Sequence, residues 1–161
     1  NHSSIIAQGI PGLVELARSP DDECRYNAAL SFRKLTSNEN SHLTIKASGG
    51  IEALFELLLA QDSKQVPTRR QAATALRDLA ANADLRTIIA EKNGIEHFVR
   101  LSRCQERSLQ ALATASLRHL AQVDTLKRPI IEADALSPAI RNAAVSFKCK
   151  EIGAIVDIIN V

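Results

Sequence analysis

The chain has 161 residues, of which 45% are hydrophobic, 3% aromatic and 24% charged, with a formal net charge of +2. Acids and bases are interspersed, so the sequence lacks the polybasic stripe that drives nucleic-acid binding. No apolar run approaches the ~20 residues needed to span a bilayer. Abundant alanine and leucine, with few glycines and prolines, favour an all-α fold with close helix packing.

A glycine-centred segment recurs along the chain. It reads GIPGLVEL from Gly9, GIEALFEL from Gly50 and GIEHFVRL from Gly94, with a weaker copy, ALSPAIRN, from Ala135. These segments start 41, 44 and 41 residues apart, and a fixed period of this size indicates stacked supersecondary units. We expect four repeats within a single domain covering 1–161, at about residues 3–44, 45–87, 88–128 and 129–161.

Each repeat is predicted to contain three helices. The short first helices are expected at 40–48, 83–92 and 123–133, the second helices begin at the glycine anchors, and the long third helices are expected at 21–36, 68–81 and 105–122. The first of these third helices follows a start signal at 19–23, with Ser19 as the capping residue, Pro20 in the first turn and three acids after it.

Corners and insertions follow from local residues. Gly49-Gly50 and Asn93-Gly94 fit a left-handed stop between first and second helices. The second repeat is three residues longer than the others, and the polar stretch 61–67 is expected to hold these extra residues, because Pro67 discourages a continuous helix there.

Three helices per ~42 residues, a Gly-Ile corner and an Ala-Ala-x-x-Leu-Arg-x-Leu third helix resemble armadillo repeats, of the kind found in β-catenin and plakophilin-like proteins. HEAT repeats are the nearest competitor, but usually have two helices and lack this corner. The resemblance covers essentially the whole chain and implies a right-handed superhelical solenoid. It also implies a non-catalytic scaffold or adaptor that binds an extended or helical segment of another protein in the concave groove lined by third helices.

The two faces of the third helices follow from a step of about 100° per residue. The predicted buried stripe contains Leu35, Phe32, Ser31 and Ala28, then Leu79, Leu76, Ala75 and Ala72, then Leu120, Leu117, Ser116 and Ala113. In armadillo proteins the opposite face lines the groove. The candidate partner-binding residues on or beside it are Arg33, Arg77, Arg118, Tyr26, Lys34, Arg70, Asp78 and His119.

Arg33, Arg77 and Arg118 occupy one equivalent position, which predicts a file of arginines. The arginine fork suits carboxylates and backbone carbonyls of a partner, but bracing between neighbouring repeats is an equally open interpretation. Beside the file, the row Lys34, Asp78, His119 and Asn160 mixes charges, which suggests recognition through specific local pairs and an acidic or mixed-charge partner.

The residues of importin-α that sandwich lysine stems are absent. Leu30, Thr74 and Ala115 stand at the tryptophan positions of that family, and the chain has no tryptophan, which argues against a basic nuclear-import signal as the ligand. No constellation indicates catalysis, a cofactor or a metal site. His2, His42, His97 and His119 fall in different repeat positions, without a nucleophile or orienting acid nearby.

Three cysteines, Cys24, Cys104 and Cys149, are odd in number and far apart. They fit free thiols in a reducing compartment, so we expect an intracellular, cytoplasmic protein, with the nucleus and peripheral membrane attachment as alternatives. The start at Asn1 suggests an excerpt of a longer chain.

The fourth repeat ends in an apolar stretch, 151–160. Terminal repeats normally carry a polar outer face, so either further repeats follow or this end docks another chain, self-association included. The alternative function is accordingly a regulatory, autoinhibitory or oligomerisation arm of a larger signalling enzyme.

Overall fold

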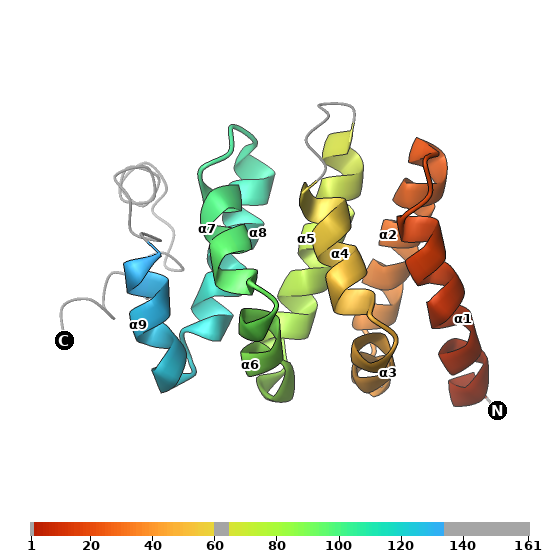
Figure 1. Ribbon diagram of the computed structural model, residues 1–161, viewed down its shortest axis with the longest axis horizontal. Coiled ribbons are helices and arrows are strands. Elements are labelled where there is room, and N and C mark those ends of the chain that lie inside the picture. The colour runs from red at the N-terminus through yellow and green to blue at the C-terminus, as the bar shows by residue number, and fades with distance from the viewer. Residues whose placement is uncertain (1, 60–64, 134–161) are drawn as a thin grey trace. The chain divides into compact units, whose positions relative to one another are not determined.

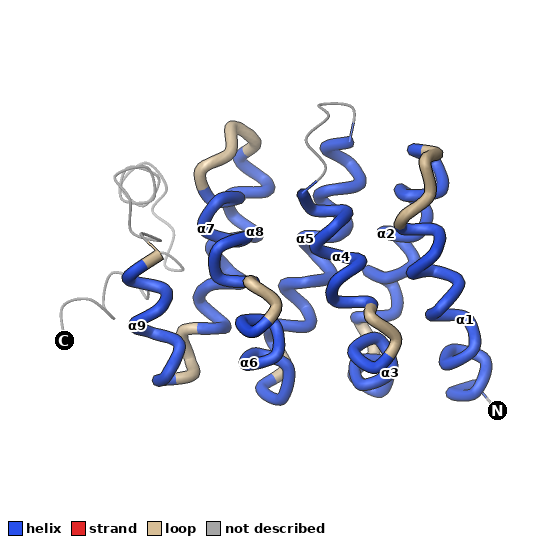
Figure 2. The backbone as a smooth tube through the Cα atoms, viewed as in Figure 1, coloured by secondary structure: helices blue, strands red, loops and turns tan. Residues whose placement is uncertain are grey.

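The computed structural model describes residues 2–59 and 65–133, with side chains from residue 8 onward. These residues form nine α-helices and one 3-10 helix (Figure 1). The described backbone is helical almost throughout, with loops confined to the turns between helices (Figure 2). The chain divides into two compact units, the first ending at Asn82 and the second beginning at Ala83.

The first unit contains α1 (His2–Ala17), α2 (Asp22–Thr36), the 3-10 helix η1 (Glu39–Ser41), α3 (His42–Ala47), α4 (Gly50–Leu59) and α5 (Val66–Ala81). Helix α2 packs against α5 and α1, while α4 packs against α5 and α1. The fully buried side chains of this core are Ile10, Phe32, Ile45, Ile51, Leu54, Leu57, Leu58, Leu76 and Leu79. The two long helices α2 and α5 therefore lie side by side.

The second unit contains α6 (Ala83–Glu91), α7 (Gly94–Ser102), α8 (Arg107–Leu120) and α9 (Asp124–Glu132). Helix α7 packs along α8, the short α6 contacts both, and α9 contacts α8. Its most buried side chains include Leu85, Ile89, Phe98, Leu109, Leu117 and Leu120. Two helices of 9 residues followed by one of 14 residues match the predicted three-helix repeat, in which the third helix is the longest.

The glycine corners have two distinct physical causes. Gly49 and Asn93 adopt left-handed φ values of 74° and 60°, which confirms the predicted helix stop. The residue that follows, Gly50 or Gly94, must be glycine because neighbouring atoms lie too close for a side chain. A Cβ on Gly50 would lie 2.7 Å from Ile45 Cγ2, and a Cβ on Gly94 would lie 2.4 Å from the Ile89 carbonyl oxygen. The anchor glycine therefore recurs because the first and second helices leave no room for a methyl group.

The first repeat lacks this corner, although its second helix was expected to begin at Gly9. Helix α1 runs without interruption from His2 to Ala17, and a Cβ on Gly9 would meet nothing within 4 Å. The residue before Gly9 is Gln8, whereas Gly49 and Asn93 precede the other two anchors. Because glutamine does not favour left-handed backbone, nothing stops the helix at this point.

The start of α2 also differs in detail from the prediction. The capping residue is Asp21 and not Ser19, because the Asp21 carboxylate accepts hydrogen bonds from the backbone N–H groups of Glu23 and Cys24, each at 3.3 Å. Ser19 Oγ instead accepts from the Asp21 N–H at 3.2 Å. Helix α5 begins at Val66, two residues before the predicted start, with Pro67 in its first turn, where a missing N–H costs nothing.

The predicted buried stripe is confirmed in all eight positions on α5 and α8, which are buried. On α2, Phe32 and Ala28 are buried, while Leu35 and Ser31 are half-buried. The fourth repeat beyond α9, including Cys149, Asn160 and the apolar stretch 151–160, lies outside the described residues.

Candidate functional site

Six of the eight candidate residues lie on α2 and α5, which pack against each other in the first unit. We call the side of these helices that lies opposite the buried stripe the α2–α5 face. It carries Tyr26, Leu30, Arg33 and Lys34 from α2, and Arg70, Thr74, Arg77 and Asp78 from α5. The two remaining candidates, Arg118 and His119, lie on α8 in the second unit.

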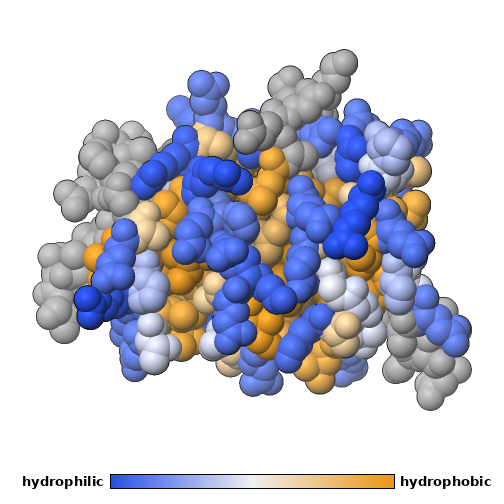
Figure 3. Space-filling view, in the orientation of Figure 1, coloured by the Kyte–Doolittle hydropathy of each residue, from blue (hydrophilic) through white to orange (hydrophobic). Residues whose placement is uncertain are grey.

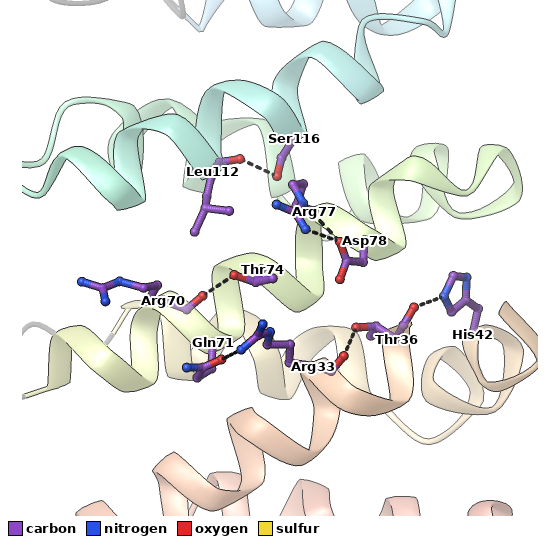
Figure 4. A network of polar contacts seen from close by, with 10 residues as sticks. All are labelled: Arg33, Thr36, His42, Arg70, Gln71, Thr74, Arg77, Asp78, Leu112 and Ser116. Atoms are coloured by element: carbon purple, nitrogen blue, oxygen red, sulfur yellow. Dashed lines mark hydrogen bonds and ion pairs between the residues drawn. The ribbon is translucent and has the colours of Figure 1, made fainter. Parts of the chain in front are cut away.

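Arg33 joins the two helices of this face. Its Nη1 donates a hydrogen bond to Gln71 Oε1 on α5 at 2.9 Å, as Figure 4 shows. The side chain is exposed, and within the described residues its Nε and Nη2 have no partner. Arg33 therefore braces neighbouring third helices and still presents hydrogen-bond donors outward. The sequence does not single out Gln71, whose only signal is its place on α5, three residues before Thr74.

Arg77, at the equivalent position on α5, is neutralised by its own neighbour. Its Nε and Nη2 both donate to Asp78 Oδ1, at 3.1 and 2.7 Å (Figure 4). The side chains of Arg77 and Asp78 are 37% and 26% exposed. Because both bonds end on Oδ1, the second carboxylate oxygen, Oδ2, accepts no hydrogen bond from any described residue. The predicted file of arginines is thus uneven in charge.

Lys34 supplies a cation beside Arg33. Its side chain is exposed, and Nζ forms no ion pair with any part of the chain that the structure describes. Both cations lie in the last turn of α2, where the negative end of the helix dipole favours them.

On α5, Arg70 is exposed, and its carbonyl accepts a hydrogen bond from Thr74 Oγ1 at 2.8 Å. Tyr26 is half-buried toward the start of α2.

A buried polar chain lies beneath Arg33. Its carbonyl accepts from Thr36 Oγ1 at 3.0 Å, and the Thr36 carbonyl accepts from His42 Nε2 at 2.8 Å (Figure 4). The other ring nitrogen, His42 Nδ1, accepts from Asn82 Nδ2 at 3.1 Å. A carbonyl only accepts, so this arrangement assigns the hydrogen to Nε2. His42 is 3% exposed, and it links the end of α2, the start of α3 and the end of α5.

In the second unit, Arg118 and His119 are half-buried in the last turn of α8. Their place near the negative end of a helix repeats that of Arg33 and Lys34 on α2. In the middle of α8, Ser116 Oγ donates to the Leu112 carbonyl at 2.9 Å (Figure 4). The hydroxyls of Thr114 and Ser116 are thus used within the helix itself.

The other chemistry of the molecule is modest. Among residues 2–59 and 65–133, no group of three or more His, Cys, Asp or Glu side chains is placed to hold a metal ion. A hydrogen bond to the Asp21 carboxylate, together with burial, raises the pKa of the Cys24 thiol, which makes it a weak nucleophile. No described helix is long and apolar enough to cross a membrane. On the side of α4 and α7 that Figure 3 shows, hydrophilic and hydrophobic side chains are intermingled.

Comparisons with known proteins place the chain among two kinds of relative. It is 31% identical over 141 residues to human catenin delta-2, an alignment that covers 84% of this chain and 11% of that protein. It is 28% identical over 141 residues to vacuolar protein 8 of Schizosaccharomyces pombe, covering 84% of this chain and 25% of that protein. The chain thus spans a quarter or less of the length of either relative. No family model matches the sequence.

Solved structures agree with this fold. An engineered protein superposes with a TM-score of 0.82 at 25% identity, covering 94% of this chain and 37% of that one. A designed armadillo repeat protein in complex with the peptide (KR)4 gives 0.80 at 18% identity, covering 94% and 64%. A chain from a study of a phosphorylation switch in the interaction between cadherin and β-catenin gives 0.75 at 19% identity, covering 91% and 27%.

Proposed function

This chain is an armadillo-repeat protein with an α-solenoid fold, and from that premise we propose that it is a non-catalytic scaffold whose α2–α5 face binds an extended segment of a partner protein. The observation that carries the proposal is the set of unfilled donors on this face. Arg33 Nε and Nη2 and Lys34 Nζ have no partner among the described residues, and both side chains are exposed. Such donors are available to form hydrogen bonds with carboxylates or backbone carbonyls of a partner.

The spacing of the helices supports an extended ligand. Packed helices stand about 8–10 Å apart, and an extended peptide advances about 3.3 Å per residue. One third helix therefore meets about every third residue of a bound strand. Tyr26 and Leu30, both half-buried on α2, add an apolar surface against which the stem of a partner side chain can pack.

The charge of the face favours an acidic or mixed-charge segment. Arg33, Lys34 and Arg70 are exposed cations, while the carboxylate of Asp78 neutralises Arg77. The designed armadillo repeat protein with a similar fold was solved with the basic peptide (KR)4. We propose the opposite preference for this chain, because a basic peptide would bring like charges against Arg33 and Lys34.

We also propose an intracellular, cytoplasmic location. Cys24 and Cys104 are both free thiols, and both are half-buried. Unpaired cysteines are typical of proteins in reducing compartments.

The test is a peptide array read with three proteins. The first is the unaltered chain, and the second carries Arg33→Ala, Arg77→Ala and Arg118→Ala. The third is a control with the same loss of charge away from the third helices, Arg100→Ala, Arg103→Ala and Arg128→Ala. Circular dichroism establishes that all three are folded.

We expect the unaltered chain and the control to capture acidic or mixed-charge peptides, and the second protein to lose at least tenfold in affinity. Equal binding by all three proteins would show that the peptide does not bind through the arginines of the third helices. Capture of no peptide by any of them would overturn the proposal and favour a regulatory arm that contacts a folded domain.

A further inference from the structure

We infer that the α2–α5 face selects partner segments in which an acidic and a basic residue stand three positions apart, an inference that rests on the proposed peptide-binding function. It comes from a reversal of charge between equivalent positions. Lys34 precedes Leu35 on α2, and Asp78 precedes Leu79 on α5, each directly after an arginine of the predicted file. The two neighbouring helices thus carry a lysine and an aspartate at equivalent positions.

The α2 position is strongly cationic. Arg33 bonds only the neutral side chain of Gln71, so its charge stays uncompensated, and Lys34 beside it forms no ion pair within the described residues. Two positive charges with unfilled N–H groups therefore stand together at the end of α2. A carboxylate in the partner gains from both cations, and an ammonium group there is repelled by both.

The α5 position has the opposite preference. Asp78 Oδ1 is occupied by both bonds from Arg77, which cancels the arginine charge, while Asp78 Oδ2 keeps its acceptor capacity in a side chain that is 26% exposed. The other cations of α5, Arg69 and Arg70, are nine and eight residues away along the helix, or about 12–14 Å, so they do not fill this acceptor. A partner lysine or arginine can donate a hydrogen bond to Oδ2, whereas a partner carboxylate would be repelled by the carboxylate of Asp78.

The distance between these positions sets the spacing of the motif. Helices that pack side by side, as α2 and α5 do, stand about 8–10 Å apart, which equals about three residues of extended chain. An all-acidic strand would place one carboxylate against Asp78, and an all-basic strand would place one cation against Arg33 and Lys34. The face therefore selects by repulsion as well as by attraction.

Fluorescence anisotropy with labelled peptides of one length tests this inference. The set contains acid-x-x-base, acid-x-x-acid and base-x-x-base peptides, and one peptide with its acid and base adjacent. The proteins are the unaltered chain, Asp78→Asn, Asp78→Lys and Lys34→Asp, each shown to be folded by circular dichroism. Asp78→Asn keeps the shape and the acceptor for Arg77 but removes the negative charge.

The unaltered chain is expected to prefer acid-x-x-base over the other three peptides by about fivefold, as two partly exposed charge pairs imply. Asp78→Asn leaves the charge of Arg77 uncompensated and should turn the preference toward acid-x-x-acid, Asp78→Lys should do so more strongly, and Lys34→Asp should shift the preference to base-x-x-base. If the unaltered chain binds acid-x-x-acid as tightly as acid-x-x-base, this inference is wrong while the proposed function stands. If it binds none of the peptides, both fail.

Discussion

His42 Nδ1 lies 3.1 Å from Asn82 Nδ2, although 40 positions separate these residues in the sequence. The other ring nitrogen bonds the Thr36 carbonyl at 2.8 Å, so one imidazole connects the ends of α2 and α5. Arg33 and Gln71 connect the same two helices on the α2–α5 face. Two side-chain links, one buried and one exposed, therefore hold together the helices that carry most of the candidate residues.

Replacing His42 by alanine should destabilise the protein by about 2–4 kcal/mol, because it opens a cavity and leaves the buried Thr36 carbonyl and Asn82 amide without these partners. Chemical denaturation gives the free energy of unfolding. His42→Gln, which keeps a donor and an acceptor, should lose less. A loss below about 0.5 kcal/mol for the alanine variant would contradict the role of His42 as a link.

The glycines should separate into two classes on substitution by alanine. Gly50→Ala and Gly94→Ala should cost about 1–3 kcal/mol or more, since the new methyl would press on Ile45 and on the Ile89 carbonyl. Gly9→Ala should stabilise the protein by about 0.5–1 kcal/mol, because the site lies inside α1 with open space around it. Thermal melts of the three variants provide the comparison, and a uniform effect would disprove the distinction.

Acid should weaken the start of α2. A hydrogen bond with the Cys24 thiol and hydrogen bonds from the N–H groups of Glu23 and Cys24 lower the pKa of Asp21 below its usual 3.8. A lowered carboxyl pKa stabilises the fold above the pKa of the unfolded chain, and this contribution is lost as the pH falls through the folded pKa. Asp21→Asn should keep the cap and flatten the loss of stability below about pH 4.

That flattening is measured by following the denaturation midpoint from pH 6 to pH 2. Asp84→Asn, also in the first turn of a helix, is the matched control. An unchanged acid dependence in Asp21→Asn would show that other carboxylates dominate.

A second titration should appear near neutral pH. Burial and the nearby Arg100 lower the pKa of His97 below its usual 6.5, while Glu96 offsets part of the effect. The unfolded chain then binds the proton more readily than the folded one, so stability should decrease as the pH falls from about 7 through the folded pKa. His97→Gln should reduce this slope, as measured by denaturation midpoints at closely spaced pH values. Arg100→Gln should reduce it in part, and an unaltered slope in both variants would contradict the assignment.

The sequence predicts the helices, the corners and the buried stripe because each leaves a local or periodic signal. The stripe follows from helical spacing, and the corners follow from Gly49 and Asn93, which tolerate left-handed backbone. What the sequence does not reveal depends on side-chain geometry between residues that no period relates. The bond of Arg33 to Gln71 and the bonds of Arg77 to Asp78 decide which cations stay available, and neither contact can be predicted from the repeat.

Local side-chain geometry also explains the two places where the structure differs from the sequence-based prediction, the cap of α2 and the missing corner at Gly9. Ser19 and Asp21 are both good capping residues, and the choice between them depends on which backbone N–H groups lie within reach. The absence of a stop at Gly9 depends on Gln8, a residue outside the recurring segment. Equivalent positions in a repeat therefore predict equivalent helices more reliably than equivalent ends.

The bond from Arg33 to Gln71 also bears on how such arrays can be recombined. The hydrogen bonds from Arg33 to Gln71 and from His42 to the Thr36 carbonyl each join α2 to a helix of the next three-helix repeat, α3 to α5. Exchanging a single repeat would separate both pairs at once. A chimaera that keeps its binding preference should therefore transfer the two long helices together, which makes the junction, and not the repeat, the transferable module.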